Sequence, residues 1–416
     1  MKEHSEMHLR GEIAEFFGLR KSMIALLAMV VLVGMGEKMA ERFLPIYLMA
    51  LGGGALTIGL LNGMTNLLSA LYSFPGGYLS DRLGYKKALL VFNLIALFGY
   101  AIVIIFPYWQ AVLVGAIFFL SWSAISLPAT MSLVSRVLPP DKRTMGVSLH
   151  SLVRRLPMAL GPVIGGVLIG IYGEKTGVRL AFVGAFILGI VSLLLQQIMI
   201  EDDKSARGKA EKRPSRLWIF MSPSLRNLLV SDILIRFAEQ IPYAFVVVWC
   251  IKENGITATE FGILTAVEMT TAFLIYLPVA YLADRSTKKP FVVITFFNFT
   301  LFPLVIFFAR SFWMMVVAFI IRGLKEFGEP TRKALIMDLA PEDKKAGMFG
   351  LYYLIRDIIV SIGAFGGAFL WQMSPQVNFF TAFACGLIGT IYFWIFGKDL
   401  ISSASKNPVT YHPKQK

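Results

Sequence analysis

Two stretches of the chain, about 202 residues apart, decide the fold. The first is Pro75-Gly-Gly77-Tyr-Leu-Ser-Asp81-Arg82-Leu-Gly84-Tyr-Lys86-Lys87, and the second is Pro278-Val-Ala-Tyr-Leu-Ala-Asp284-Arg285-Ser-Thr-Lys288-Lys289. Each ends an apolar run that is long enough to cross a bilayer as a helix. Matches on several helices indicate an internal duplication. The other matched pairs, at nearly the same spacing, are Pro128 and Pro330, Asp141 and Asp343, Arg154 and Arg356, Gly161 and Gly363, and Glu41 and Glu239.

The rest of the chain is strongly apolar. Of its 416 residues, 56% are hydrophobic and 16% are charged, and the mean hydropathy of +0.67 is far from that of a soluble domain. The apolar runs are continuous rather than alternating, which excludes a transmembrane barrel. We therefore predict an all-α membrane protein with twelve spans. The predicted spans are 22–50, 53–80, 88–106, 109–136, 144–172, 178–200, 226–251, 258–283, 290–309, 311–338, 346–373 and 377–396.

The basic residues predict how the chain lies in the membrane. Of the 40 Lys and Arg, 28 lie at the termini or near even-numbered connections, and 4 lie near odd-numbered ones. The positive-inside rule then places both termini in the cytoplasm, and it explains the net charge of +14 without a nucleic-acid partner. The predicted domains are a tail at 1–21, a bundle at 22–200, a basic linker at 201–225, a second bundle at 226–396 and a tail at 397–416.

The chain shows no pattern typical of a cofactor or metal site. Its two cysteines form neither a disulfide framework nor a zinc motif. It has no Walker A, HExxH or GxSxG sequence, which disfavours ATP-driven transport and the common hydrolases. The N-terminus lacks the pattern of a cleaved signal peptide. We expect no cofactor, no metal and no enzyme activity.

The duplication and the loop motif together resemble the major facilitator superfamily. The resemblance spans nearly the whole chain and implies two pseudo-symmetric six-helix bundles, a secondary transporter and alternating access. We interpret the loop motif as a cytoplasmic latch, formed by Gly77, Asp81, Arg82, Gly84 and Lys86 and repeated at Asp284 and Arg285. The alternative is that its basic residues only set the orientation of the chain in the membrane. The expected partners are a small-molecule substrate, protons and membrane lipids, for a protein that acts as a monomer in the cell membrane.

A second resemblance is narrower. Gly161-Pro162-Val-Ile-Gly165-Gly166 is similar to a Gly-Pro element of proton-driven exporters in this superfamily, although Pro157 stands where that element usually begins with glycine. The alternative is that these small residues only let two helices approach closely. The predicted fourth helix lacks the arginine that the exporters usually carry.

Sixteen charged residues, eight of each sign, lie near the centres of the predicted spans. Each costs roughly 2.5–3.5 kcal/mol in lipid, so they must face one another or water. We predict substrate contacts at Arg154, Arg236, Arg322, Lys325, Glu326 and Arg356, and proton carriers among Glu41, Glu239, Glu326 and Glu329. The alternative is that the charges are structural ion pairs, with Arg356 paired to Glu326 or Glu239. The full set is Glu37, Lys38, Glu41, Arg42, Arg154, Arg155, Asp232, Arg236, Glu239, Glu268, Arg322, Lys325, Glu326, Glu329, Arg356 and Asp357.

These observations predict a secondary transporter of a small charged or zwitterionic organic solute, driven by protons and directed outward. An importer or facilitator of an organic anion with the same fold is the alternative. A transporter-like sensor or a membrane enzyme fits less well, because no grouping of nucleophile, base and metal ligands is visible.

Overall fold

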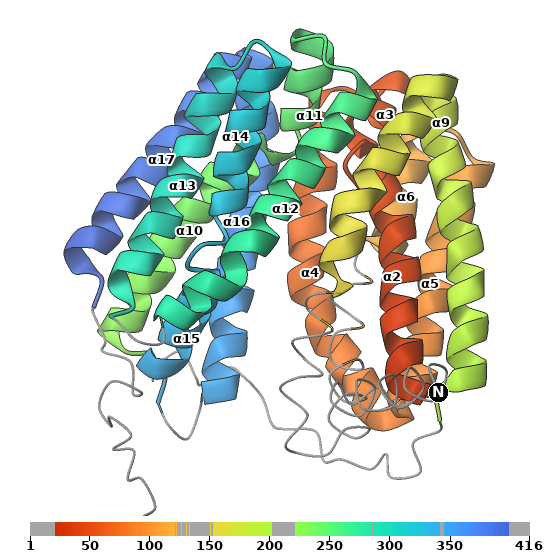
Figure 1. Cartoon of the computed structure of the whole chain (residues 1–416), viewed down its shortest axis with the longest axis horizontal. Coiled ribbons are helices and arrows are strands. Elements are labelled where there is room, and N and C mark those ends of the chain that lie inside the picture. The colour runs from red at the N-terminus through yellow and green to blue at the C-terminus, as the bar shows by residue number, and fades with distance from the viewer. Residues whose placement is uncertain are drawn as a thin grey trace, which may run out of the picture. The chain divides into compact units, whose positions relative to one another are not determined.

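The computed structural model describes residues 21–120, 122, 126, 130, 133, 150, 153–201, 221–283, 287–341 and 345–398. The fold is all-α, as predicted. The helices, shown in Figure 1, are α2 (Lys21–Glu41), α3 (Leu44–Ala50), α4 (Ala55–Leu83), α5 (Tyr85–Ile105), α6 (Trp109–Phe119), α9 (Arg155–Met199), α10 (Pro223–Tyr243), α11 (Val246–Val248), η3 (Trp249–Glu253), α12 (Ala258–Ala283), α13 (Lys289–Phe308), α14 (Phe312–Leu324), α15 (Glu329–Leu339), α16 (Lys345–Met373) and α17 (Pro375–Phe396).

The chain forms two compact units. Unit 1 contains Met1–Lys212, Tyr243–Ala266 and Ser361–Met373, and unit 2 contains Arg213–Pro242, Val267–Val360 and Ser374–Lys416. In unit 1, α2 packs along α9, and α5 packs against both α6 and α9. In unit 2, α13 packs against α17, α14 and α15. The domain boundaries predicted from sequence stay a prediction.

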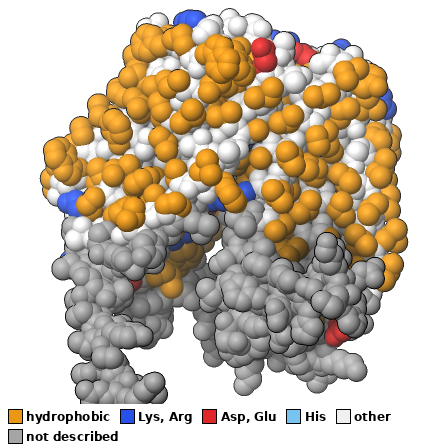
Figure 2. Space-filling model, viewed as in Figure 1, with side chains coloured by type: hydrophobic (Ala, Val, Ile, Leu, Met, Phe, Trp, Pro, Cys, Tyr) orange, Lys and Arg blue, Asp and Glu red, His pale blue; other side chains and the backbone are white. Residues whose placement is uncertain are grey.

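Several helices of this fold are suited to a bilayer. Within the described part of the chain, seven helices are long and apolar enough to span it, and the bent pair Pro223–Tyr243 and Val246–Glu253 makes eight if it is one span. Large apolar side chains such as Ile198 and Trp313 are 73% and 76% exposed, and hydrophobic side chains cover much of the described surface in Figure 2. A surface of this kind requires lipid rather than water. The protein is therefore a multi-pass membrane protein, and the number twelve stays a prediction.

Three predicted spans are interrupted where charged residues gather. The predicted span 311–338 is divided into α14 and α15 by a turn at residues 325–328. The span 22–50 breaks after Glu41, and the span 226–251 bends by 40° before Val246. Pro45 and Pro330 lie in the first turns of α3 and α15, where a missing backbone N–H costs nothing. Such breaks in a membrane helix are tolerated where protein or water satisfies the backbone.

The predicted spans 144–172 and 178–200 meet at Gly173. This residue has a φ of 77° inside α9, a left-handed conformation that glycine adopts without steric cost. The label α9 therefore covers two helices that join at Gly173, where the chain changes direction. The glycine thus replaces a longer connection between two membrane helices.

A polar contact fixes the turn inside the predicted tenth span. The backbone N–H of Gly328 donates to Thr295 Oγ1 on α13 at 2.5 Å. Gly328 also lies so close to α13 that an added Cβ would meet the backbone of Phe291. The turn therefore stays next to α13, and it carries Lys325 and Glu326 at defined positions.

Candidate functional site

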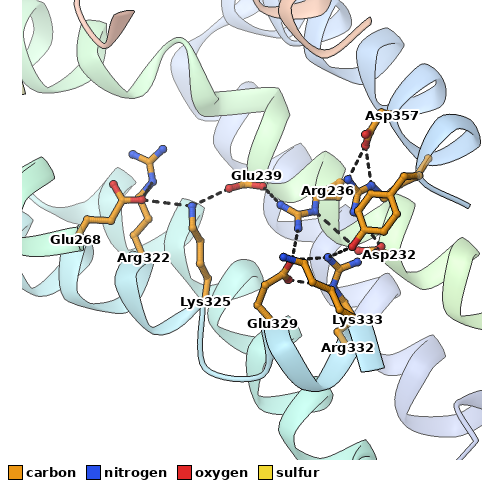
Figure 3. Close-up of polar contacts among 12 residues, drawn as sticks. Asp232, Arg236, Glu239, Glu268, Arg322, Lys325, Glu329, Arg332, Lys333 and Asp357 are labelled. Atoms are coloured by element: carbon orange, nitrogen blue, oxygen red, sulfur yellow. Dashed lines mark hydrogen bonds and ion pairs between the residues drawn. The ribbon is translucent and has the colours of Figure 1, made fainter. Parts of the chain in front are cut away.

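The principal cluster of charged side chains lies in unit 2. Figure 3 shows it as one continuous chain of ion pairs between α10, α12, α15, α16 and the end of α14. Five carboxylates alternate with six cations, so that each charge contacts at least one of opposite sign. We call it the C-terminal ion-pair chain; it consists of Asp232, Arg236, Glu239, Glu268, Arg322, Lys325, Glu329, Arg332, Lys333, Arg356 and Asp357.

One end of the C-terminal ion-pair chain is centred on Lys325, the first residue of the turn after α14. Its Nζ lies 2.8 Å from Glu239 Oε1 and 3.3 Å from Glu268 Oε1. Arg322 Nε is also 3.3 Å from Glu268 Oε1, and the Glu268 side chain has no exposure to solvent. Glu239 in turn lies 2.6 Å from Arg236 Nη1. Both Glu239 and Lys325 are thus shared between partners on different elements.

A small pocket adjoins the Lys325 end of the C-terminal ion-pair chain. Glu239, Arg322 and Lys325 line it together with Asn298, Phe299 and Phe302 of α13. The Arg322 guanidinium lies 4.9 Å from the centre of the Phe302 ring, a cation-π contact. The enclosed space holds on the order of one water molecule. Water therefore has a place next to the carboxylate of Glu239.

The other end is built around Asp232 on α10, which is 1% exposed. Asp232 accepts from Arg332, from the Tyr352 hydroxyl at 3.0 Å and from Arg356 Nη1 at 3.4 Å. Arg332 also donates to both carboxylate oxygens of Glu329, at 3.0 and 2.7 Å. The planar fork of a guanidinium fits such a double contact. Arg332 therefore joins α15 to α10 in the core of unit 2.

Sequence reasoning missed Arg332. It counted this residue with the basic side chains near the cytoplasmic connections, and not with the sixteen charges inside spans. In the structure Arg332 is 1% exposed and has two carboxylate partners. The signal in the sequence was its spacing of three residues from Glu329, which places both side chains on one helix face.

Unit 1 carries a smaller group of charges on α2. Lys38 Nζ lies 3.0 Å from Glu37 Oε1 and also contacts Glu41. The guanidinium of Arg42 stacks on the Tyr243 ring at 5.2 Å. Arg154, which precedes α9, is attracted by the charge of Glu37. Pairs of Lys38 with Glu41 and of Arg236 with Glu239 repeat the same spacing in the two halves.

The repeat-related arginines have different surroundings. Arg356 contacts Asp357 at 2.7 Å as well as Asp232, so its partners are not the Glu326 or Glu239 that the sequence suggested. For Arg154, no described residue hydrogen-bonds to the guanidinium or places a carboxylate within ion-pair distance of it. Glu326 lies in the turn beside Lys325, and its charge acts on Lys325.

The glycines of the predicted packing element lie at close helix contacts in unit 1. A Cβ added at Gly161 would lie 2.7 Å from Lys38 Cβ, and one at Gly165 would meet Met39 of α2. A Cβ at Gly166 would meet Ala258 of α12, and the carbonyl of Pro162 lies against Gly262. This geometry is what a packing surface requires.

The loop motif is described only in part. Gly84 separates α4 from α5 with a φ of 80°, which favours glycine. Arg82 donates to the Tyr78 hydroxyl at 3.3 Å, and the Lys86 carbonyl accepts from Gln196 Nε2 at 2.8 Å. Gly77 and Asp81 belong to α4, but the Asp81 side chain lies outside the described part, as do Asp284 and Arg285.

Comparison with known proteins identifies the family. The profile described as Major Facilitator Superfamily matches residues 26–234 and 228–412. The chain belongs to the major facilitator superfamily. This superfamily consists of membrane transporters, not enzymes, so the predicted transporter class is confirmed.

Several members of the superfamily are similar in sequence to this chain over half of its length or more. An uncharacterized MFS-type transporter of Methanocaldococcus jannaschii is 20% identical over 83% of this chain and 87% of its own length. A second one from the same organism is 23% identical over 83% of this chain and 90% of its own length. The quinolone resistance protein NorA of Staphylococcus aureus is 25% identical over 51% of this chain and 55% of its own length.

Solved structures of superfamily members share the fold. A peptide transporter of the POT type superimposes with a TM-score of 0.75, at 15% identity, over 91% of this chain and 93% of its own. The nucleoside transporter NupG superimposes with a TM-score of 0.76, at 12% identity, over 90% and 100%. At these identities the likeness concerns the fold alone.

Proposed function

We propose that this protein is a proton-coupled secondary transporter that exports a small charged or zwitterionic organic solute by alternating access. The observation that carries the proposal is the C-terminal ion-pair chain. Ionisable groups inside a membrane are costly and mark ion or solute pathways. Buried ion pairs are also poor stabilisers compared with apolar packing, so stability alone is a weak reason for eleven charged residues in one chain.

Shared partners make the C-terminal ion-pair chain suited to taking up a proton. Lys325 contacts both Glu239 and Glu268, and Arg236 contacts Asp232, Glu239 and Glu329. When Glu239 is neutralised by a proton, Lys325 therefore keeps Glu268, and Arg236 keeps Asp232 and Glu329, as anionic partners. The desolvation cost of an isolated buried charge is then avoided. The water-sized pocket beside Glu239 leaves room for a water molecule that exchanges a proton with that carboxylate.

Proteoliposomes with an imposed pH gradient test the coupling. Four Gln variants, at Glu41, Glu239, Glu326 and Glu329, are compared with wild type for gradient-driven accumulation and for exchange of solute against solute. Neutralising the proton carrier is expected to abolish accumulation and to spare exchange, because exchange needs no net proton movement. If all four variants still accumulate solute, the coupling role of these glutamates is wrong.

Two observations support export. The Gly161 to Gly166 segment is similar to the element of proton-driven exporters, and the chain is similar to a protein named for quinolone resistance. The alternative is uptake or facilitated transport of an organic anion. It is favoured by the cationic side chains around α2 and α9, where Lys38, Arg42, Arg154 and Arg155 outnumber Glu37 and Glu41. The direction of accumulation relative to the acidic side of the vesicle separates the two.

The loop motif is proposed to act as a cytoplasmic latch, in a monomer that lies in the cell membrane with both termini in the cytoplasm. The acidic residue itself supports the latch: orientation by positive charge does not require a carboxylate at position 81, whereas a latch uses one to pair with a helix N-terminus or an arginine. Asp81→Asn removes that charge and keeps the shape, so it should slow transport while leaving the amount of folded protein unchanged. Normal transport by Asp81→Asn would contradict the latch, and the motif would then serve only to set the orientation of the protein in the membrane.

A further inference from the structure

Among the described residues, the charge cluster of unit 2 is balanced, whereas that of unit 1 has more cations than carboxylates. In unit 2 the ion-pair chain and Glu326 contribute six carboxylates and six cations once Arg332 and Lys333 are included. In unit 1 the described charges of this kind are two carboxylates and four cations. An excess of positive charge in a poorly hydrated region is unfavourable without a counterion. The members of the unit 1 group are Glu37, Glu41, Lys38, Arg42, Arg154 and Arg155.

Arg154 is the member of this group that the described residues leave available. Its repeat-related counterpart, Arg356, is 7% exposed and contacts the carboxylates of Asp232 and Asp357. Arg154 is partly exposed, and no carboxylate or other acceptor of a described residue lies within hydrogen-bond distance of its guanidinium. The five N–H donors of a guanidinium normally find acceptors when they leave bulk water. The duplication therefore produced one arginine that is paired with two carboxylates and one for which the described residues supply no acceptor.

The surroundings of Arg154 favour an anion over a cation. Glu37 attracts it from beyond ion-pair distance, but Glu37 is already 3.0 Å from Lys38. The neighbouring Arg155 adds a second positive charge that repels Arg154. His150 lies one helical turn before Arg154, and its backbone carbonyl accepts from the Arg154 N–H at 3.0 Å. A cationic solute would meet repulsion here, whereas a carboxylate or phosphate would neutralise the excess charge.

We propose that Arg154 binds the anionic group of the transported solute and that Arg356 is a structural member of the C-terminal ion-pair chain. The solute is then an organic acid, a phosphate ester or a zwitterion with one carboxylate or phosphate, held by the two parallel N–H groups of the guanidinium. This inference rests on the proposed transport function and narrows its substrate class.

A thermal-shift titration of the purified full-length protein tests the inference. The probes are succinate, benzoate, glycerol 3-phosphate, choline and sorbitol. A ligand of the folded state raises the melting temperature in proportion to its affinity and concentration. We expect at least one of the three anions to stabilise the wild type, and choline and sorbitol to have no effect. If no anion stabilises the wild type, the inference is overturned.

Variants then assign the binding to one side chain. Arg154→Gln should abolish the anion-dependent rise in melting temperature. Arg154→Lys should raise the anion concentration at half-saturation by roughly tenfold, because the charge remains and the fork is lost. Arg356→Lys should lower the melting temperature without ligand but keep the anion titration. Arg179→Lys is the matched control on α9, since Arg179 is exposed and donates to the Ile104 carbonyl at 2.8 Å. An Arg154→Gln protein with the wild-type titration contradicts the proposal.

Chemical labelling gives a readout that needs no transported solute. Phenylglyoxal reacts with accessible guanidinium groups, and peptide mass spectrometry assigns each labelled residue. We expect Arg154 to react faster than Arg332 and Arg356, which contact carboxylates, and the stabilising anion to slow the reaction at Arg154 alone. A rate at Arg154 as low as that at Arg332 overturns the inference.

The outcomes also separate this inference from the proposed function. Loss of the anion shift in Arg154→Gln, together with no gradient-driven transport by the wild type, supports the anion site and contradicts proton-coupled transport. Gradient-driven transport of choline that Arg154→Gln leaves unchanged supports the transporter and contradicts the anion site.

Discussion

Arg332 provides the sharpest test of the buried ion-pair chain. Its guanidinium is 1% exposed and contacts Asp232, also 1% exposed, and both oxygens of Glu329. Arg332→Met keeps much of the side-chain volume and removes the charge. Among the described residues, Asp232 then keeps Arg236, Arg356 and Tyr352 as partners, at 3.0 Å or more.

The expected loss is about 3–5 kcal/mol of unfolding free energy, the range for removing one partner of a buried ion pair. The measurement is reversible unfolding of the purified protein in mixed micelles. Lys333→Met is the matched control, because Lys333 is the next residue, lies 3.5 Å from the same Glu329 and is 49% exposed. An exposed pair contributes about 1 kcal/mol or less.

A second substitution tests the cause. Adding Asp232→Asn to Arg332→Met removes the buried carboxylate that has lost its Arg332 contact, so the double variant should regain about 1–2 kcal/mol relative to Arg332→Met alone. If Arg332→Met is no less stable than Lys333→Met, the buried contacts of Arg332 do not stabilise unit 2 and the reasoning is refuted.

Three further predictions concern other parts of the chain. Thr295→Val removes the acceptor for the backbone N–H that begins α15 and should cost about 1–3 kcal/mol in the same unfolding assay, whereas Thr295→Ser should cost less; equal losses would contradict the hydrogen bond. Gly161→Ala should cost about 1–3 kcal/mol by overpacking α9 on α2, whereas Gly366→Ala, which meets open space, should not destabilise. Lys209→Cys should react with an impermeant maleimide in inverted vesicles and stay unlabelled in intact cells.

Short-range features of the polar cluster were readable from the sequence. Lys38 with Glu41, and Arg236 with Glu239, are three residues apart, and both pairs form in the structure. Such spacing places two side chains on one face of a helix whatever surrounds it. The same rule would have paired Glu329 with Arg332, had Arg332 not been counted with the cytoplasmic charges.

Long-range partners were not readable in this way. Arg332 and Asp232 are 100 residues apart, and Arg356 contacts Asp232 rather than Glu326 or Glu239. Sequence spacing carries no information about the rotation and axial shift of one helix against another. Packing sets both, through close approaches such as that of Gly161 to Lys38.

The sequence by itself determined the membrane class, the duplication and the family, because apolar runs of about 20 residues and repeated motifs are local properties of the chain. Tertiary structure decided which charges neutralise one another and where the predicted tenth span breaks, since Thr295 on a neighbouring helix holds the turn at Gly328. Tertiary structure also gave the two repeat-related arginines different partners. Arg356 contacts two carboxylates, while Arg154 contacts none among the described residues. The physical reason is that electrostatic partners are chosen by distance in space, which only the packing of the helices sets.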